Sequence, residues 1–245
     1  SEKSAFSKVR LKRQFAKNKK LKVVIATHCF YDNPHGLGKM MFKDYYYWLN
    51  YLVNLSKKTN YDWYVKPHPD YLPGTLENIK KIVLDKSDIK LVEPSVSWKQ
   101  LVEEGLYVVL TCHGSLGHEL PLLGVKVINA AYNPHSGFTF NHHCKSLEEY
   151  EEAILNLKSL KIDFNKKDIY KFYYMNYKYT NVDNIFYESY EKMTNTLNKF
   201  EQNNIKAYTY FFENTPKSKI KENINNMQKF INSNKIHYFL NGPED

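Results

Sequence analysis

Residues 107–129 read YVVLTCHGSLGHELPLLGVKVIN, and this stretch decides the fold class. The β-branched run Tyr107–Thr111 predicts a buried strand, which leads through a glycine-containing turn into a helix over about 117–123. Gly124 ends that helix, and a second apolar run, Val125–Asn129, follows at once. A strand, a short helix and another strand joined by tight links are typical of a parallel βαβ unit.

The same alternation extends toward the N-terminus. Apolar runs predict strands at Lys22–Thr27, Asp62–Val65 and Ile89–Val92, and apolar residues spaced three and four apart predict helices over 39–58, 75–85 and 97–105. Strands that alternate with helices through short links predict an α/β fold, a Rossmann-like doubly wound parallel sheet over residues 22–160.

Two other segments flank this predicted domain. We predict that residues 1–21 are a basic arm or linker and that residues 161–245 are a helical C-terminal extension. Helical patterns run over 147–160, 168–179 and 182–200, and residues 201–245 show only weak helical periodicity.

Composition and charge restrict the classes of partner. The 245 residues are 42% hydrophobic and 25% charged, which is typical of a globular protein. Residues 1–22 contain nine Lys and Arg against one Glu, a local net charge of +8 out of +9 for the chain. The body therefore lacks the surplus of cations that a nucleic-acid-binding surface needs, and we expect no nucleic-acid partner. The arm is either a linker or a contact to an anionic membrane surface.

Cysteine usage and hydropathy bear on location. Cys29, Cys112 and Cys144 have no zinc-knuckle or disulfide-framework spacing, which favours a reducing compartment. The longest apolar runs are too short to span a bilayer. We expect a cytoplasmic protein, with peripheral attachment at the inner membrane as an open alternative.

Four polar clusters directly follow predicted strands. They lie at residues 28–35, 66–70, 113–119 and 129–135. In an open parallel sheet the carboxyl ends of the strands meet at one edge, and ligands bind in the crevice outside that edge. The four clusters therefore predict one ligand site.

Two of these clusters have the chemistry of phosphate binding. In His113-Gly114-Ser115-Leu116-Gly117-His118-Glu119, glycines allow close backbone approach, and N–H groups at the start of a helix favour an anion. The carboxylate of Glu119 can accept hydrogen bonds from ribose hydroxyls. Lys66 and His68 lie on a Pro-stiffened turn, where a cation and an imidazole can meet a diphosphate or a leaving phosphate.

The remaining candidate residues concern acid–base chemistry and metals. His28 and Asp32 could act as a general base on a hydroxyl. The histidines of this loop have no recognisable metal-ligand spacing, and His142-His143 beside Cys144 is a weak metal signal that is more typical of a surface loop. We therefore expect no metal and no cofactor.

Three motifs together resemble a known family. They are THCFYDNPH at 27–35, WYVKPHP at 63–69 and TCHGSLGHELPLLGVKVI at 111–128. This succession, over roughly residues 20–190, is similar to bacterial capsule and surface-polysaccharide glycosyltransferases of the GT-B form. The segment resembles their C-terminal, nucleotide-donor domain.

The resemblance implies a function and roles for individual residues. It implies transfer of a sugar from a CMP-, CDP- or UDP-activated donor to a glycan or lipid-linked acceptor, without a metal. His68 would meet the donor phosphate, and Ser115, Gly117 and Glu119, with His113, would form the loop that binds phosphate and ribose. A GT-B enzyme has two Rossmann-like domains, whereas one βα series is present here, so an upstream acceptor-binding domain or a partner chain is expected.

Two alternatives remain open from the sequence. The same loops would serve the transfer of a phospho-linked group, such as a polyol phosphate, from a CDP-activated donor. They would also serve a non-catalytic nucleotide-binding domain whose catalytic half lies elsewhere.

Overall fold

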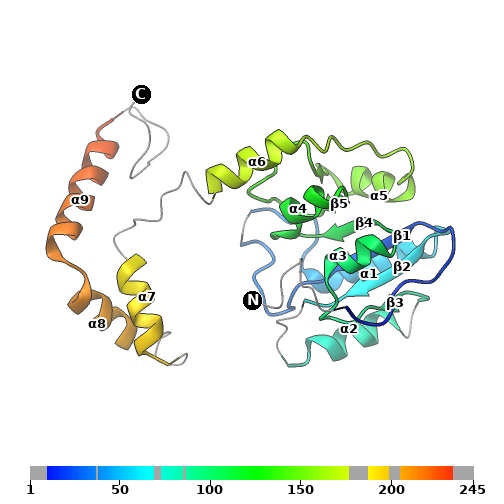
Figure 1. Cartoon of the computed structure of the whole chain (residues 1–245), viewed down its shortest axis with the longest axis horizontal. Helices are drawn as coiled ribbons and strands as arrows, with labels where there is room; N and C mark the ends of the chain where they lie inside the picture. Colours follow the sequence, from blue (N-terminus) through cyan, green and yellow to red (C-terminus); the bar gives the residue numbers. More distant parts are fainter. Residues whose placement is uncertain are drawn as a thin grey trace. The chain divides into compact units, whose positions relative to one another are not determined.

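The computed structural model describes residues 10–36, 38–68, 73–84, 87–176, 187–198 and 205–233. Contacts between residues divide the chain into two compact units, Ser1–Tyr170 and Lys171–Asp245 (Figure 1). The first unit contains the sheet and all the candidate residues. The second begins ten residues later than the predicted C-terminal extension.

The first unit is built on a six-stranded sheet. Its strands are β1 (Lys22–Ala26), β2 (Asp62–Lys66), β3 (Lys90–Leu91), β4 (Leu106–Thr111), β5 (Lys126–Asn129) and β6 (His142–His143). Their spatial order is β3-β2-β1-β4-β5-β6, and every neighbouring pair is parallel. This is the order typical of the Rossmann fold, so the predicted fold class is confirmed.

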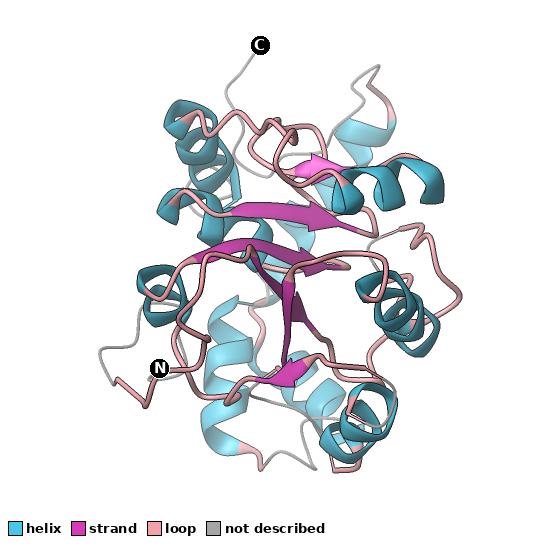
Figure 2. Cartoon of the chain, turned by 90° about the vertical axis from the view of Figure 1, so that its right-hand side faces the viewer, coloured by secondary structure: helices cyan, strands magenta, loops and turns pink. Residues whose placement is uncertain are grey.

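Helices cover both faces of the sheet, as Figure 2 shows. They are α1 (Tyr45–Ser56), α2 (Thr75–Val83), α3 (Trp98–Glu103), α4 (Leu116–Glu119), the 3-10 turn η1 (Leu120–Leu123) and α5 (Leu147–Leu155). Successive strand residues face opposite sides, so Val23 and Ile25 join a core with α1, α2 and α5, and Val24 joins a second core with α3 and η1. Burial on both faces explains why these strands are continuous apolar runs.

The helix predicted over 39–58 begins later, at Tyr45. The Asp44 side chain accepts a hydrogen bond from the Tyr47 N–H and caps the helix. The preceding residues instead pair with the chain after β5, where Met40 forms an antiparallel bridge to Ala131. Residues 39–44 have apolar residues at helical spacing, but the bridge of Met40 to Ala131 keeps them out of the helix.

The described part of the N-terminal segment, residues 10–21, lies on the sheet-containing unit. Phe15 is 2% exposed and packs against Tyr64 with ring centroids 4.4 Å apart. The Glu104 carboxylate accepts the N–H groups of Gln14 and Phe15 at 2.8 and 2.9 Å. The sequence pattern, read as an arm or linker, gave no sign of this packing.

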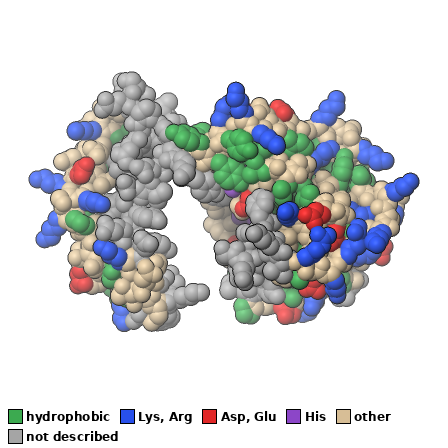
Figure 3. Space-filling view, in the orientation of Figure 1, with side chains coloured by type: hydrophobic (Ala, Val, Ile, Leu, Met, Phe, Trp, Pro, Cys, Tyr) green, Lys and Arg blue, Asp and Glu red, His purple; other side chains and the backbone are tan. Residues whose placement is uncertain are grey.

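Among the described residues 10–22, three cations form side-chain bonds within the sheet-containing unit. Lys22 is 3% exposed and pairs with Asp62 at 2.8 Å, and Arg10 pairs with Glu103 at 2.7 Å. Arg13 donates to the Phe15 carbonyl at 2.9 Å. On the face in Figure 3 the Lys and Arg side chains form separate groups among other residues, with no continuous basic patch over the described part.

The helices toward the C-terminus are α6 (Lys166–Tyr174), α7 (Tyr187–Thr196), α8 (Ile205–Asn214) and α9 (Lys217–Ile231). The predicted helix ends at 179 and at 200, and the start at 182, lie outside the described residues. Residues 201–245 showed only weak periodicity, yet their described part, 205–233, contains the helices α8 and α9. Among the described helices we find none that is both long and apolar enough to cross a bilayer.

Candidate functional site

The carboxyl ends of β1 and β4 adjoin at the centre of the sheet. The chain leaves β1 toward β2 on one side, whereas β4 lies on the other side of β1. In doubly wound folds ligands bind in the crevice outside the strand ends at such a reversal of strand order. His28 follows β1 and His113 follows β4, so both candidate histidines stand at this point.

His28, His113 and Tyr45 form a packed cluster there. The Tyr45 hydroxyl lies 2.9 Å from His113 Nε2, and the His28 ring stacks on the Tyr45 ring at 4.9 Å. His28 Nε2 lies 3.2 Å from Thr111 Oγ1 and accepts the His113 N–H at 3.5 Å. Residues from β1, α1 and β4 are thereby fixed against one another.

Burial keeps this cluster uncharged. Burial, followed by the nearby imidazoles of His113 and His68, lowers the pKa of His28 to about 3. Burial also lowers the pKa of His113, which the Asp32 carboxylate opposes. Hydrogen-bond and ring contacts join His28, after β1, to His113, after β4. A buried imidazole that holds a proton this weakly is, however, a poor general base near neutral pH.

The glycine-rich loop after β4 has a defined shape. Gly114 has φ +118°, which favours glycine, and its N–H donates to Asn133 Oδ1 at 3.0 Å. The Asn133 amide in turn donates to the carbonyls of Cys112 and Ala131 at 3.2 and 2.9 Å. Ser115 is exposed at the tip of the loop.

Backbone N–H groups remain available in this loop. Within the described residues, the N–H groups of Ser115 and Leu116 donate to no acceptor of the chain, whereas those of Gly117, His118 and Glu119 close the first turn. The half-buried Glu119 carboxylate likewise makes no hydrogen bond or ion pair there. Donors and an acceptor that a nucleotide could use are therefore present.

Gly117 lies against a second group of histidines. A Cβ on Gly117 would stand 2.2 Å from His135 Nε2, and His135 is fully buried. His135 Nδ1 lies 3.3 Å from both His143 Nε2 and Asn141 Nδ2. Burial lowers the pKa of His135 to about 3, followed by the effect of His143, so this group is neutral as well.

Sequence reasoning flagged the polar residues 129–135 but selected none of them as site residues. It missed His143 because β6 was not predicted. A strand of two residues leaves no periodicity to detect, and only pairing with Ile128 and Asn129 defines it. The sequence signal that could have pointed to this group is the density of histidines between residues 113 and 143.

Lys66 and His68 are placed differently from each other. The Lys66 ammonium is buried, donates to the Pro94 carbonyl, and lies 5.3 Å from the centre of the Trp98 ring. Burial lowers its pKa to about 8. His68 is exposed. His68 is therefore open to solvent at the end of β2, whereas Lys66 would have to leave Pro94 to meet a ligand.

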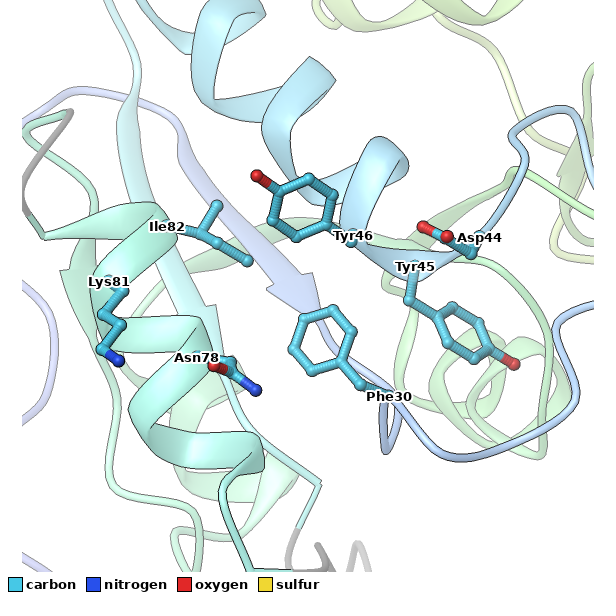
Figure 4. Close-up of a pocket in the computed structure, with 7 residues that line it drawn as sticks. All are labelled: Phe30, Asp44, Tyr45, Tyr46, Asn78, Lys81 and Ile82. Atoms are coloured by element: carbon cyan, nitrogen blue, oxygen red, sulfur yellow. The ribbon is translucent and has the colours of Figure 1, made fainter.

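An open pocket of about 450 Å³ lies beside the cluster, between α1, α2 and the loop after β1 (Figure 4). It is lined by Phe30, Asp44, Tyr45, Tyr46, Asn78, Lys81 and Ile82. In Figure 4 the Phe30 ring lies in the middle of the labelled residues, between α2 and Tyr45 and below the Tyr46 ring. Aromatic walls with a few charged and amide groups are typical of a small-molecule pocket.

Comparison with known proteins adds little to this geometry. No protein-family model and no curated protein matches the chain. Among solved structures, UDP-GlcNAc 2-epimerase from Neisseria meningitidis, bound to UDP-GlcNAc, is similar over 63% of this chain with 17% identity and a TM-score of 0.39. The match spans 39% of the epimerase's length. A likeness at this level indicates nothing about what this chain binds.

Proposed function

We propose that this chain is the donor-binding part of a glycosyltransferase that moves a sugar from a nucleotide-activated donor to a capsule or other surface polysaccharide. One observation carries the proposal: the loops after β1 and β4 bring His28 and His113 together, with ring centroids 4.6 Å apart, at the β1–β4 reversal. This is the crevice in which Rossmann-like sheets bind nucleotides. The resemblance of the three sequence motifs to capsule glycosyltransferases points the same way.

The donor would lie across the loop after β4. Its phosphates would receive hydrogen bonds from the N–H groups of Ser115 and Leu116 and from the imidazoles of His68 and His113. These N–H groups and imidazoles would stabilise the negative charge that develops on the leaving phosphate by hydrogen bonds. Glu119 would accept from the ribose hydroxyls. No step of this mechanism requires a metal.

The acceptor would occupy the side of Asp32 and the pocket next to α1. Asp32 is exposed in the loop after β1, and its carboxylate opposes the lowering of the His113 pKa. Asp32 can therefore meet an acceptor hydroxyl and is our candidate for the general base, whereas His28, packed against Tyr45 and Thr111, suits a positioning role. Phe30 and Tyr46 would pack against the acceptor's sugar ring.

A nucleotide panel tests donor binding. The full chain is heated with CMP, CDP, UDP or GDP, and a nucleotide that binds only the folded state raises the unfolding midpoint by mass action. At a hundred times Kd the gain is about 2.7 kcal/mol. We expect one or two of the four to act. A midpoint unchanged by all four at millimolar concentration would refute the nucleotide site.

A turnover assay separates a transferase from a binding domain. Release of the nucleotide from the preferred activated sugar, with an oligosaccharide acceptor, should be lost in Asp32→Asn while nucleotide affinity is kept. Asp88→Asn, at an exposed position before β3, is the matched control. Binding without turnover in the parent chain favours a non-catalytic domain, and turnover of a CDP-linked polyol favours the phospho-group alternative.

A further inference from the structure

Three metal-ligating side chains gather at the edge of the sheet, away from the β1–β4 crevice. His142 belongs to β6, Cys144 follows it directly, and Glu149 lies in the first turn of α5. One ligand atom from each, an imidazole nitrogen, the thiol sulfur and a carboxylate oxygen, lies within 4.8 Å of the other two. In the sequence His142-His143 beside Cys144 was only a weak metal signal, and Glu149 was not connected with it, because the short strand β6 that positions His142 was not predicted.

Each of the three groups has a ligand atom to offer. His142 Nε2 is buried and makes no hydrogen bond within the described residues, and it lies 3.8 Å from Glu149 Oε1. Cys144 is a free, half-buried thiol. A buried imidazole nitrogen without a hydrogen bond is a cost in free energy that a metal bond would remove.

Backbone contacts hold the Glu149 carboxylate in place. Its Oε2 accepts the Lys145 N–H at 2.7 Å, and its own N–H donates to Ser146 Oγ at 3.2 Å, which caps α5. One carboxylate oxygen is thereby fixed by the start of the helix, while Oε1 is directed toward His142. Such an outer hydrogen bond is the device that orients metal-binding carboxylates.

We propose that His142, Cys144 and Glu149 bind a zinc ion. One nitrogen, one sulfur and one oxygen suit zinc, whereas Mg²⁺ and Ca²⁺ take oxygen ligands. In a tetrahedral site with zinc–ligand bonds of about 2.0–2.3 Å, neighbouring ligand atoms lie roughly 3.5 Å apart. The 3.8 Å between His142 Nε2 and Glu149 Oε1 is close to that value. Side-chain movements of about 1 Å would bring the Cys144 sulfur to the same spacing.

The ion would join the sheet edge to α5. β6 has only two residues, paired on one side with Ile128 and Asn129, so a bond from His142 through the metal to Glu149 would fix both elements. The site lies three strands from β1, roughly 14 Å at 4.8 Å per strand, and takes no part in the proposed donor chemistry. With three protein ligands, the fourth position would be filled by water.

Titration of the tag-free, chelator-treated full chain with Zn²⁺ and with Co²⁺ tests the proposal. We expect one ion per chain, a thiolate-to-cobalt charge-transfer band that identifies the sulfur ligand, and a higher unfolding midpoint with metal. Metal binding should also release a proton from the Cys144 thiol. An affinity weaker than millimolar, or cobalt binding without the charge-transfer band, would overturn the assignment.

Ligand variants give the decisive comparison. Cys144→Ser and Glu149→Gln should each weaken zinc binding by more than about tenfold, since loss of even an outer hydrogen-bond partner has an effect of that size. Glutamine keeps an oxygen that can accept the Lys145 N–H, so α5 should still form. Glu148→Gln, at the exposed neighbouring position, is the matched control and should bind like the parent chain. Unchanged zinc affinity in Cys144→Ser would refute the site, whatever the parent chain binds.

Discussion

Replacing Gly117 with alanine tests how closely the loop after β4 packs on the histidines beneath it. The new Cβ would stand 2.2 Å from Nε2 and 2.3 Å from Cε1 of His135, whereas an unstrained contact needs about 3.5 Å. His135 is fully buried and lies 3.3 Å from both Asn141 and His143, so the ring has no room to withdraw. Overpacking of this kind costs about 1–3 kcal/mol, and we expect the upper half of that range.

Local propensity predicts the opposite sign. Gly117 lies in α4, where alanine is favoured over glycine by about 1 kcal/mol. The measurement is the free energy of unfolding in urea, together with the thermal midpoint, which should fall by roughly 4–12 °C for a unit of this size. Gly137→Ala is the matched control, because a Cβ there meets nothing within 4 Å. It should change stability by no more than about 0.5 kcal/mol.

A double-mutant cycle assigns the cause. If the clash is with His135, the cost of Gly117→Ala should largely vanish in the His135→Ala background, since the ring that the Cβ meets is then gone. This account of the packing is refuted if Gly117→Ala alone is as stable as the parent chain. It is also refuted if Gly117→Ala costs the same free energy of unfolding in the His135→Ala background.

Further predictions concern pH, the proposed donor site and the N-terminal segment. Stability should fall as pH is lowered from 7 to 5. Burial lowers the pKa of His135 from 6.5 in the unfolded chain to about 3 in the folded one, so the unfolded chain binds more protons in this pH range. A thermal midpoint that stays constant between pH 7 and pH 5 would contradict this. His68→Ala should weaken binding of the preferred nucleotide about tenfold by calorimetry without changing the unfolding midpoint of the free protein. Glu119→Gln should weaken binding of the preferred nucleotide by about 1–3 kcal/mol. If the variant weakens binding of a nucleotide without ribose hydroxyls by the same amount, Glu119 does not contact the ribose. Glu104→Ala should cost about 1–3 kcal/mol in urea unfolding, because two backbone N–H groups of the N-terminal segment lose their acceptor, whereas Glu103→Ala should cost less than about 1 kcal/mol.

The membrane contact of residues 1–22 stays a prediction. Co-sedimentation of the chain, with and without residues 1–20, on vesicles of increasing acidic-lipid content measures it. Because Phe15 is part of a core, the shortened form needs a parallel check of its unfolding midpoint. Equal sedimentation of two folded forms would leave the segment without a membrane role.

The sequence by itself determined the sheet and the edge at which a ligand would bind. Strand runs such as Tyr107–Thr111, the glycine turns and the helical spacing are local signals, because side-chain period and backbone freedom depend on neighbouring residues only. Once the strands are parallel, the polar residues that follow them must share one edge. The contact between His28 and His113 was therefore predictable without any structure.

Only the tertiary structure decided which way individual side chains face and what holds them. Lys66 is buried against Pro94 and Trp98 because its position in β2 directs it to the α3 face, a choice that depends on sheet register. β6 exists through pairing with β5, and Phe15 is buried through contacts with Tyr64 and Glu104, distant in the sequence. Such contacts form between residues far apart in the chain, so no local pattern contains them, and the charge, the burial and the partners of a site residue follow from them alone.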